Sequence, residues 1–292
     1  MNRREFSQLL TVGVLEHALP RSQKQSRRLP NAFRFSVMLW ALEKRAPLEK
    51  CIEMVAAAGY QGVELVGEFE KWSPEENRRI MARIRSLGLV VDSMSGVRAG
   101  FSDPKQSEQF MEQLAHQIMA ATELGCRQII LLSGNRVDGL AATVQNLTSV
   151  ENLKRSSDLA SKHEIEIVIE PIDPIENPAV YMTSVSDGFE IVREVSRSNV
   201  KVLYDFYHEQ RAAGNLIEKL EKNVDLVGLV HIADVPGRHE PGTGEIDYVT
   251  IYRKLAQLRY DGYIAMEYYP TGDPVKSLRK SRLEALQAAR TA

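Results

Sequence analysis

From residue 33 to the end of the chain, short runs of apolar residues alternate with longer amphipathic stretches. Two of the runs, 128–132 and 165–169, are apolar enough to be covered on both faces, as parallel strands are. Strands that alternate with helices in this way are typical of successive parallel βα units. We predict eight strands, at 33–39, 62–66, 89–94, 128–132, 165–170, 200–205, 227–232 and 263–267.

The amphipathic stretches predict helices between these strands, including 47–58, 74–87 and 106–124. Ser73-Pro74-Glu75-Glu76 combines an N-cap, a proline at the first helical position and acids near the positive end of the helix dipole. Glycines at 59, 88 and 125 follow the first three helices, where the left-handed conformation is common. The pattern therefore marks both ends of several helices.

Eight βα units match either a closed barrel or an open, doubly wound sheet. No G-x-G-x-x-G sequence follows the first strand, and such a sequence would be expected in a dinucleotide-binding open sheet. We therefore predict a single (β/α)8 TIM barrel over residues 33–292, preceded by a short N-terminal extension at 1–32. In such a barrel the working residues lie at the C-terminal ends of the strands.

The extension begins like a twin-arginine export signal, because Arg3-Arg4-Glu5-Phe6 is followed by the apolar segment 9–15. Glu16 and His17 interrupt that segment and no A-x-A cleavage pattern follows, so an uncleaved leader and a plain tail are both compatible with it. Residues 21–30 are polar and basic, as in a linker. The expected compartment is the cytoplasm, or the periplasm if the leader functions.

Composition narrows the class of partner. The chain of 292 residues is 43% hydrophobic and 26% charged, with a formal net charge of -2, as in ordinary globular proteins. It has no broad basic field for nucleic acid and no run near the roughly 20 apolar residues that span a bilayer. Cys51 and Cys126 lack metal-site spacing and are predicted to be buried apolar residues. We expect a small-molecule substrate; the sequence leaves a homo-oligomer open.

Four potential metal ligands stand at or next to the ends of the last four predicted strands. They are Glu170, Asp205, His231 and Glu267. Any one of these acids could simply cap a strand or pair with a basic residue at the rim. Because successive positions are about one βα unit apart, closure of the barrel would bring all four side chains to one point. Three carboxylates and an imidazole favour Mg²⁺, Mn²⁺ or Co²⁺, with open positions for substrate oxygens.

The same rim carries further polar groups. Glu176 follows the fifth strand, His208 follows the sixth, and Arg238 lies in a long loop at 231–247 that is rich in glycine, proline and charge. Arg238 offers a planar fork for a carboxylate or hydroxyl group. Trp40, just after the first strand, is compatible with two roles: it lines the apolar side of the same pocket, or it packs in the wall with no selective role. His116 and His163 fall in helical segments away from the rim and are expected to be ordinary surface residues.

These residues resemble the xylose isomerase-like barrels, and within them the hydroxypyruvate isomerase family. The resemblance covers residue 33 to about 289. Its specific parts are the loop sequence Gly-Arg-His-Glu-Pro-Gly-Thr-Gly-Glu-Ile-Asp-Tyr at 237–248, Tyr-Asp-Phe-Tyr-His-Glu-Gln at 204–210 and Gly-Tyr-Ile-Ala-Met-Glu-Tyr at 262–268. The resemblance implies a metal-dependent isomerase that interconverts hydroxypyruvate and tartronate semialdehyde through an enediolate.

Carried over by position, the resemblance implies particular roles for the rim residues. Glu170 and Glu267 would be the acid/base pair as well as metal ligands, beside Asp205 and His231. The substrate would be held by Glu176, His208 and Arg238.

One departure keeps other reactions open. Bacterial hydroxypyruvate isomerases often carry Gln at the position of His231, whereas ketose 3-epimerases carry His. A ketose 3-epimerase or an inositol or keto-sugar dehydratase is therefore an alternative on the same metal site. A non-catalytic sugar-binding barrel is a second alternative, although it would be expected to lack a rim acid. A metal-dependent endonuclease would need more histidine ligands and a basic groove, and the sequence has neither.

Overall fold

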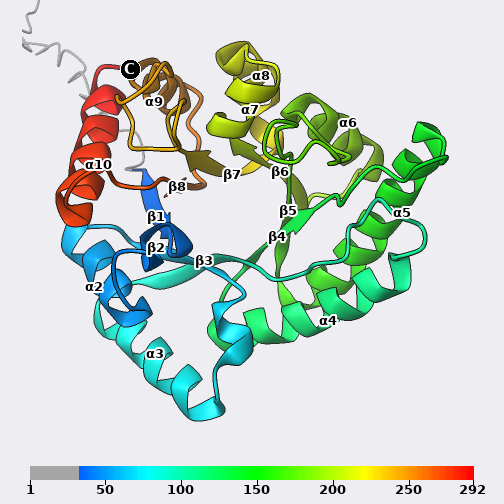
Figure 1. Cartoon of the computed structure of the whole chain (residues 1–292), viewed down its shortest axis with the longest axis horizontal. Helices are drawn as coiled ribbons and strands as arrows, with labels where there is room; N and C mark the ends of the chain where they lie inside the picture. Colours follow the sequence, from blue (N-terminus) through cyan, green and yellow to red (C-terminus); the bar gives the residue numbers. More distant parts are fainter. Residues whose placement is uncertain (1–32) are drawn as a thin grey trace, which may run out of the picture.

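Eight parallel strands close into a barrel in the computed structural model, which describes residues 33–292. Each strand pairs with the next along the chain, and β8 pairs with β1 to close the ring (Figure 1). The strands are β1 (Arg34–Met38), β2 (Gly62–Val66), β3 (Val90–Ser95), β4 (Gln128–Leu132), β5 (Glu166–Glu170), β6 (Val200–Asp205), β7 (Val227–Ile232) and β8 (Tyr263–Met266). The predicted barrel is confirmed; the hypothesis of an export signal concerns residues outside the described range.

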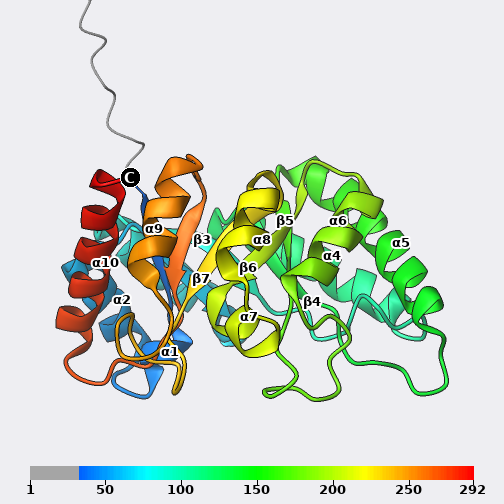
Figure 2. The same ribbon diagram turned by 90° about the horizontal axis from the view of Figure 1, so that it is seen from above.

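Helices surround the barrel on its outside, and the view from above shows them as a wall along the strands (Figure 2). They are α1 (Trp40–Glu43), α2 (Leu48–Ala58), α3 (Pro74–Ser86), α4 (Ser107–Leu124), α5 (Ala142–Ala160), α6 (Val185–Val195), α7 (Phe206–Ala212), α8 (Leu216–Asn223), α9 (Tyr248–Gln257) and α10 (Pro274–Arg290). Short 3-10 turns occur at η1 (Glu68–Lys71), η2 (Ser161–His163) and η3 (Val224–Leu226). No helix within residues 33–292 has the length and apolar character that a bilayer span requires.

The predicted helix signals act as expected. Ser73 caps α3: its hydroxyl accepts a hydrogen bond from the Glu76 amide, and the Glu76 carboxylate accepts one from the Ser73 amide. Pro74 is the first residue of that helix. At the end of α2, Gly59 has a φ of 87°, a conformation that costs a residue with a side chain more than it costs glycine.

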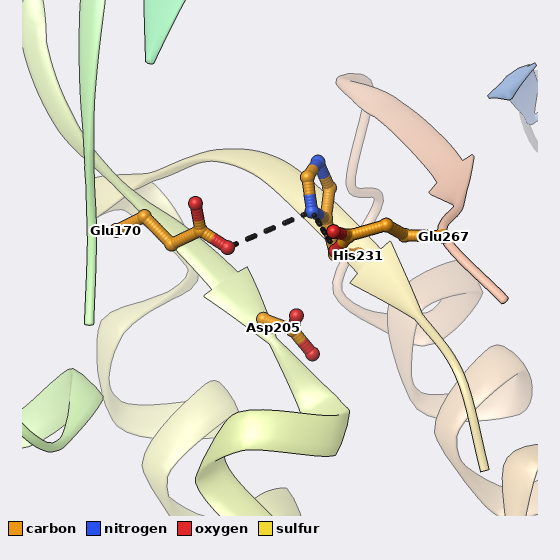
Figure 3. Close-up of side chains that lie close together, drawn as sticks. All are labelled: Glu170, Asp205, His231 and Glu267. Atoms are coloured by element: carbon orange, nitrogen blue, oxygen red, sulfur yellow. Dashed lines mark hydrogen bonds and ion pairs between the residues drawn. The ribbon is translucent and has the colours of Figure 1, made fainter. Parts of the chain in front are cut away.

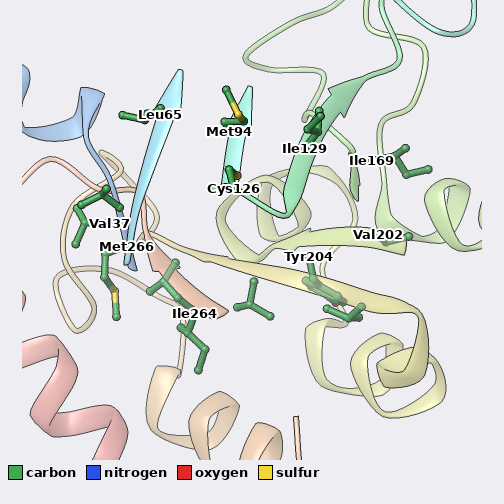
Figure 4. Packing of buried hydrophobic residues seen from close by; sticks show 14 of the residues in the cluster. Val37, Leu65, Met94, Cys126, Ile129, Ile169, Val202, Tyr204, Ile264 and Met266 are labelled. Atoms are coloured by element: carbon green, nitrogen blue, oxygen red, sulfur yellow. The ribbon is translucent and has the colours of Figure 1, made fainter. Parts of the chain in front are cut away.

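Successive strand residues enter two different cores, as the period-two geometry of a strand requires. One set packs outward beneath the helices, including Val37, Ile129, Val202 and Ile264 (Figure 4). Their neighbours form a separate cluster inside the barrel: Met38, Ile130, Val168, Leu203, Leu229 and Ala265. Both cysteines are free and buried, as predicted. The doubly covered strands explain the nearly continuous apolar runs in the sequence.

The first three strands bury polar side chains in the middle of the strand, and not at its C-terminal end. Ser36 of β1, Glu64 of β2, and Asp92 and Ser93 of β3 are all less than a tenth exposed. Buried polar groups require partners, since an unpaired one costs roughly 1–3 kcal/mol. Glu64 accepts a hydrogen bond from Ser93, and it also lies beside a residue of the candidate site.

Candidate metal and active site

Three carboxylate side chains and one imidazole converge at the C-terminal rim of the barrel (Figure 3). Glu170 and Asp205 end β5 and β6, His231 is the last but one residue of β7, and Glu267 directly follows β8. One ligand atom from each lies within 4.8 Å of those of the other three, and all four residues are buried. The spatial convergence expected from the sequence is therefore present.

The strand ends determine how these side chains are presented. Asp205 also caps α7, because its Oδ1 accepts hydrogen bonds from the amides of Tyr207, at 2.7 Å, and His208, at 3.2 Å. Asp205 is paired with His231 in the register of β6 and β7, so the two side chains emerge side by side. Oδ2 of Asp205 is left to face the centre of the group.

The imidazole of His231 lies between two sets of carboxylates. Its Nδ1 is 2.9 Å from Glu267 Oε2 and 3.8 Å from Glu170 Oε1. Its Nε2 is 3.1 Å from Glu64 Oε2, on the side of the ring away from the rim. Sequence reasoning missed Glu64; the signal was an acid in the middle of the short β2 run Gly-Val-Glu-Leu-Val.

The pKa values of Glu170 and Glu267 are shifted in opposite directions, because burial dominates at the first and neighbouring positive charge at the second. Burial raises the pKa of Glu170 to about 8, against the attraction of His231. Burial would also raise the pKa of Glu267, but the charges of Arg238 and His231 outweigh it and hold that pKa well below its usual range. Two carboxyl groups tuned apart in this way are suited to act as acid and base.

The donor set fits a hard divalent cation. Three carboxylates and one imidazole nitrogen supply oxygen-rich ligation of the kind that Mg²⁺ and Mn²⁺ accept. Like charges buried this close repel one another, and a cation among them would remove that cost. These residues could therefore hold a metal ion, and the identity of the ion stays a prediction.

Arg238 covers the open side of the group. Its guanidinium is 2.5 Å from Glu267 Oε1 and 3.2 Å from Glu176, and it stacks between the rings of Trp40, at 5.3 Å, and Tyr207, at 5.0 Å. Only 8% of the residue is exposed. The burial of a cation between aromatic rings and carboxylates fixes the direction in which its remaining donors point.

The loop after β7 is organised around a buried carboxylate, Asp234. Its Oδ2 accepts hydrogen bonds from the amides of Gly242 and Gly244, and its Oδ1 accepts one from Ile246. A Cβ on Gly244 would lie 1.9 Å from the carbonyl oxygen of Val235, so only glycine fits there. The tightly folded loop holds Arg238 over the barrel.

His208 lies deeper in the wall. Its Nδ1 is 2.7 Å from Asp173 Oδ2 and its Nε2 is 3.6 Å from Asp205 Oδ2. Burial would lower the pKa of His208, but Asp205 and Asp173 raise it to about 9. Asp173, which is fully buried and also 3.4 Å from Arg211, was missed by sequence reasoning because its loop is irregular. Asp173, Glu176 and His208 form a second group within 4.8 Å.

These groups open into a cavity of about 490 Å³. Glu170, Glu267, Glu176, His208 and Arg238 line it on the polar side. Apolar and aromatic residues line most of the rest, namely Met38, Trp40, Val66, Ile130, Leu132, Ile172, Tyr207 and Tyr269, together with Ser95 and Gly237. His116 and His163 are not among the lining residues, as expected, and of the two roles left open for Trp40 the cavity lining includes it. The size suits a small polar molecule.

Comparison with known families agrees with this architecture. The profile described as "Xylose isomerase-like TIM barrel" matches residues 52–288. The chain belongs to this family. Hydroxypyruvate isomerase of Escherichia coli is 30% identical to it over 84% of this chain and 97% of that protein. The 2-oxo-tetronate isomerase of Haemophilus influenzae is 29% identical over 84% and 96% of the two chains. The predicted family and enzyme class, an isomerase, are confirmed.

Among solved structures, one titled AP endonuclease, family 2, from Brucella melitensis superimposes with a TM-score of 0.77 at 26% identity, covering 84% of this chain and 96% of that one. D-psicose 3-epimerase of Clostridium cellulolyticum has a TM-score of 0.71 at 19% identity, covering 89% and 99%. The second likeness concerns the fold alone. Proteins with this barrel fold therefore carry names of different reactions.

Proposed function

We propose that this isomerase interconverts hydroxypyruvate and tartronate semialdehyde, or a closely related small hydroxy-keto acid, at the rim of the barrel with the help of a divalent cation. The observation that carries the proposal is the buried convergence of Glu170, Asp205, His231 and Glu267 beside a small polar cavity. The similarity to curated hydroxypyruvate and 2-oxo-tetronate isomerases supports the class of substrate.

A cation held by the four residues would polarise the substrate carbonyl and neutralise the negative charge that develops on the enediolate. Glu170 and Glu267 both line the cavity, from β5 and from the end of β8. One removes the proton from C3 of hydroxypyruvate, and a proton returns to C2. The hydroxyl proton moves from O3 to O2, so the step is an isomerisation without an oxidant. Each acid/base group is expected to contribute about 10²–10⁴-fold.

The remaining polar residues orient the substrate. Arg238 presents a guanidinium whose direction is fixed by Trp40 and Tyr207, which suits the carboxylate of a keto acid. Glu176 is the more exposed acid beside Arg238, and His208 is a buried donor on the same side. Both can pair with substrate hydroxyl groups.

The test is turnover in D₂O, followed by NMR. Mg²⁺ is the ion used in the NMR assay, and Mn²⁺ is kept for measurements of metal binding. The protein loaded with Mg²⁺ is incubated with hydroxypyruvate, a 2-oxo-tetronate and a neutral ketose such as D-tagatose. We expect hydroxypyruvate or the tetronate to be converted fastest, with solvent deuterium appearing at C2 of the product. The variant Glu166→Gln is the matched control, because Glu166 lies at the opposite end of β5.

Other outcomes would replace the proposal. Faster deuterium exchange at C3 of the ketose, with inversion, would indicate a 3-epimerase, and loss of water from a keto-sugar or inositol would indicate a dehydratase. Binding of sugars with no exchange into any of them would indicate a non-catalytic barrel. Cleavage of a duplex that contains an abasic site would indicate an endonuclease.

A further inference from the structure

His231 is the one nitrogen donor among the four converging residues, and its two ring nitrogens face different surroundings. Nδ1 points into the rim group, 2.9 Å from Glu267 Oε2 and 3.8 Å from Glu170 Oε1. Nε2 points away from that group and lies 3.1 Å from Glu64 Oε2. Only Nδ1 is therefore in a position to join the three carboxylates around one ion.

Glu64 is itself held in place. The hydroxyl of Ser93 on the adjacent strand donates a hydrogen bond of 2.7 Å to Glu64 Oε1, which leaves Oε2 directed at the imidazole. Glu64, Ser93 and His231 are all fully buried. Within residues 33–292 neither Glu64 Oε2 nor His231 Nε2 forms a geometrically well-aligned hydrogen bond, and the ion-pair contact that joins them is the 3.1 Å one between the two atoms themselves. Each of these two atoms therefore depends on the other for its partner.

We propose that Glu64 is a positioning residue that accepts the Nε2–H of His231 and so makes Nδ1 the metal ligand. A neutral imidazole carries one proton, and a carboxylate beside one nitrogen keeps the proton there and the lone pair on the other. The proposal rests on the metal site of the proposed function and adds the residue that orients one of its ligands.

The energetic consequence follows from the position of Glu64. A carboxylate behind a ligating histidine fixes the ring and raises its basicity, and loss of such a group typically costs 10–100-fold in metal affinity. Glu64 is not in the cavity lining, so its removal should change metal binding without a direct contact to substrate.

Two variants separate charge and hydrogen bonding from packing. Glu64→Leu keeps a side chain of similar size but cannot accept the Nε2–H. Glu64→Gln keeps an acceptor oxygen and should rescue part of the loss. Asp92→Asn is the matched control, because Asp92 is another buried acid of the first three strands, lines the cavity at the N-terminal end, and forms no ion pair with His231 among the described residues.

The first experiment measures Mn²⁺ binding to the purified full-length protein by titration calorimetry, with thermal unfolding as a check on folding. We expect Glu64→Leu to bind Mn²⁺ about 10–100-fold more weakly than the wild type. Glu64→Gln should lose less Mn²⁺ affinity than Glu64→Leu. The affinity of Asp92→Asn should stay within about threefold of the wild type, which is well below the loss expected when the hydrogen-bond partner of a ligating histidine is removed. Affinity of Glu64→Leu within twofold of the wild type, in a folded protein, would overturn the proposal.

The second experiment needs no change at Glu64. The wild-type protein with ¹⁵N-labelled histidine is saturated with Mg²⁺, and two-bond ¹⁵N–¹H spectra report which ring nitrogen carries the proton. The His231 pattern is the one that disappears in His231→Gln. We expect a protonated Nε2 and an unprotonated Nδ1; the reverse assignment would overturn the proposal.

The metal site and the role of Glu64 can fail separately. A wild-type protein that binds neither Mn²⁺ nor Mg²⁺ would refute the proposed metal site, and the role of Glu64 with it. A wild-type protein that binds the ion while Glu64→Leu binds it equally well would refute the role of Glu64 alone.

Discussion

The two ends of the barrel both carry charged residues, but they use them differently. At the N-terminal end a cavity of about 330 Å³ is lined by Arg34, Arg127, Lys201, Glu164 and Glu166, among others. There most of the charges form simple pairs, such as Arg127–Glu164 and Lys201–Glu166, whose side chains are partly or largely exposed, and the buried acid Asp92 stands alone among the described residues rather than in a group. At the C-terminal rim the charges are buried and several meet at one point.

The difference shows which charged residues indicate chemistry. A partly exposed pair is satisfied by its partner and by water, and contributes little to stability. A buried group of acids that share one centre cannot be satisfied pairwise, so it needs a cation or a proton. Convergence and burial together, rather than charge at a strand end, mark the functional end of the barrel.

Of the changes that test the difference between the two ends of the barrel, removal of the metal from the C-terminal rim should have the largest effect on turnover. Exhaustive chelation is expected to abolish turnover, because the rim carboxylates would lose the cation that the proposed reaction needs, and added Mn²⁺ or Mg²⁺ should restore it. Turnover and elemental analysis are measured on the same sample. Full activity in a sample free of metal would remove metal-assisted chemistry from the proposal.

Replacement of Glu267 should come next. Glu267→Gln is expected to keep the fold and to lower kcat by about 10²–10⁴-fold, since the amide cannot move a proton. Glu166→Gln at the other end of the barrel is the control and should keep near-normal kcat. If both variants turned over substrate at similar rates, Glu267 would have no part in the mechanism.

Arg238→Lys tests the fork that faces the cavity. A lysine keeps the charge but cannot reach Glu267 and Glu176 together or stack in the same way between Trp40 and Tyr207. We expect kcat/KM to fall by about 10–100-fold, in line with the roughly 1.5–3 kcal/mol of a hydrogen bond to a charged group. A steady-state analysis on hydroxypyruvate measures this, and an unchanged KM and kcat would contradict it.

The smallest effect is expected at the N-terminal end. Lys201→Gln breaks the 3.4 Å pair with Glu166, and we expect activity within about twofold of the wild type and a loss of stability below about 1 kcal/mol. Chemical denaturation and turnover test both values. A large loss of activity would mean that the two ends of the barrel are coupled.

The sequence was sufficient to predict the features that depend on local pattern. The strands lie within a residue or two of their predicted positions, because alternation and helix caps are encoded in neighbouring residues. Glu170, Asp205, His231 and Glu267 could be grouped in advance because each sits where its strand ends, and a closed barrel brings strand ends together.

Contacts that depend on how distant segments meet were not predictable. Glu64 lies in the middle of β2, and its relation to His231 depends on the register of strands on opposite sides of the barrel. Asp173 belongs to an irregular loop, and only the folded chain shows it bonded to His208. The stacking of Arg238 on Trp40 and Tyr207 joins the loop after β7 to α1 and α7, which no local pattern encodes.

The pairing of β1 with β8 joins the first and last strands of the described residues to each other. Because Glu267 comes just after β8, the candidate centre stays incomplete until all eight strands have been synthesised and the eighth has docked. Recovery of turnover after dilution from denaturant would therefore report a late event in refolding, whereas helical circular dichroism would report earlier ones.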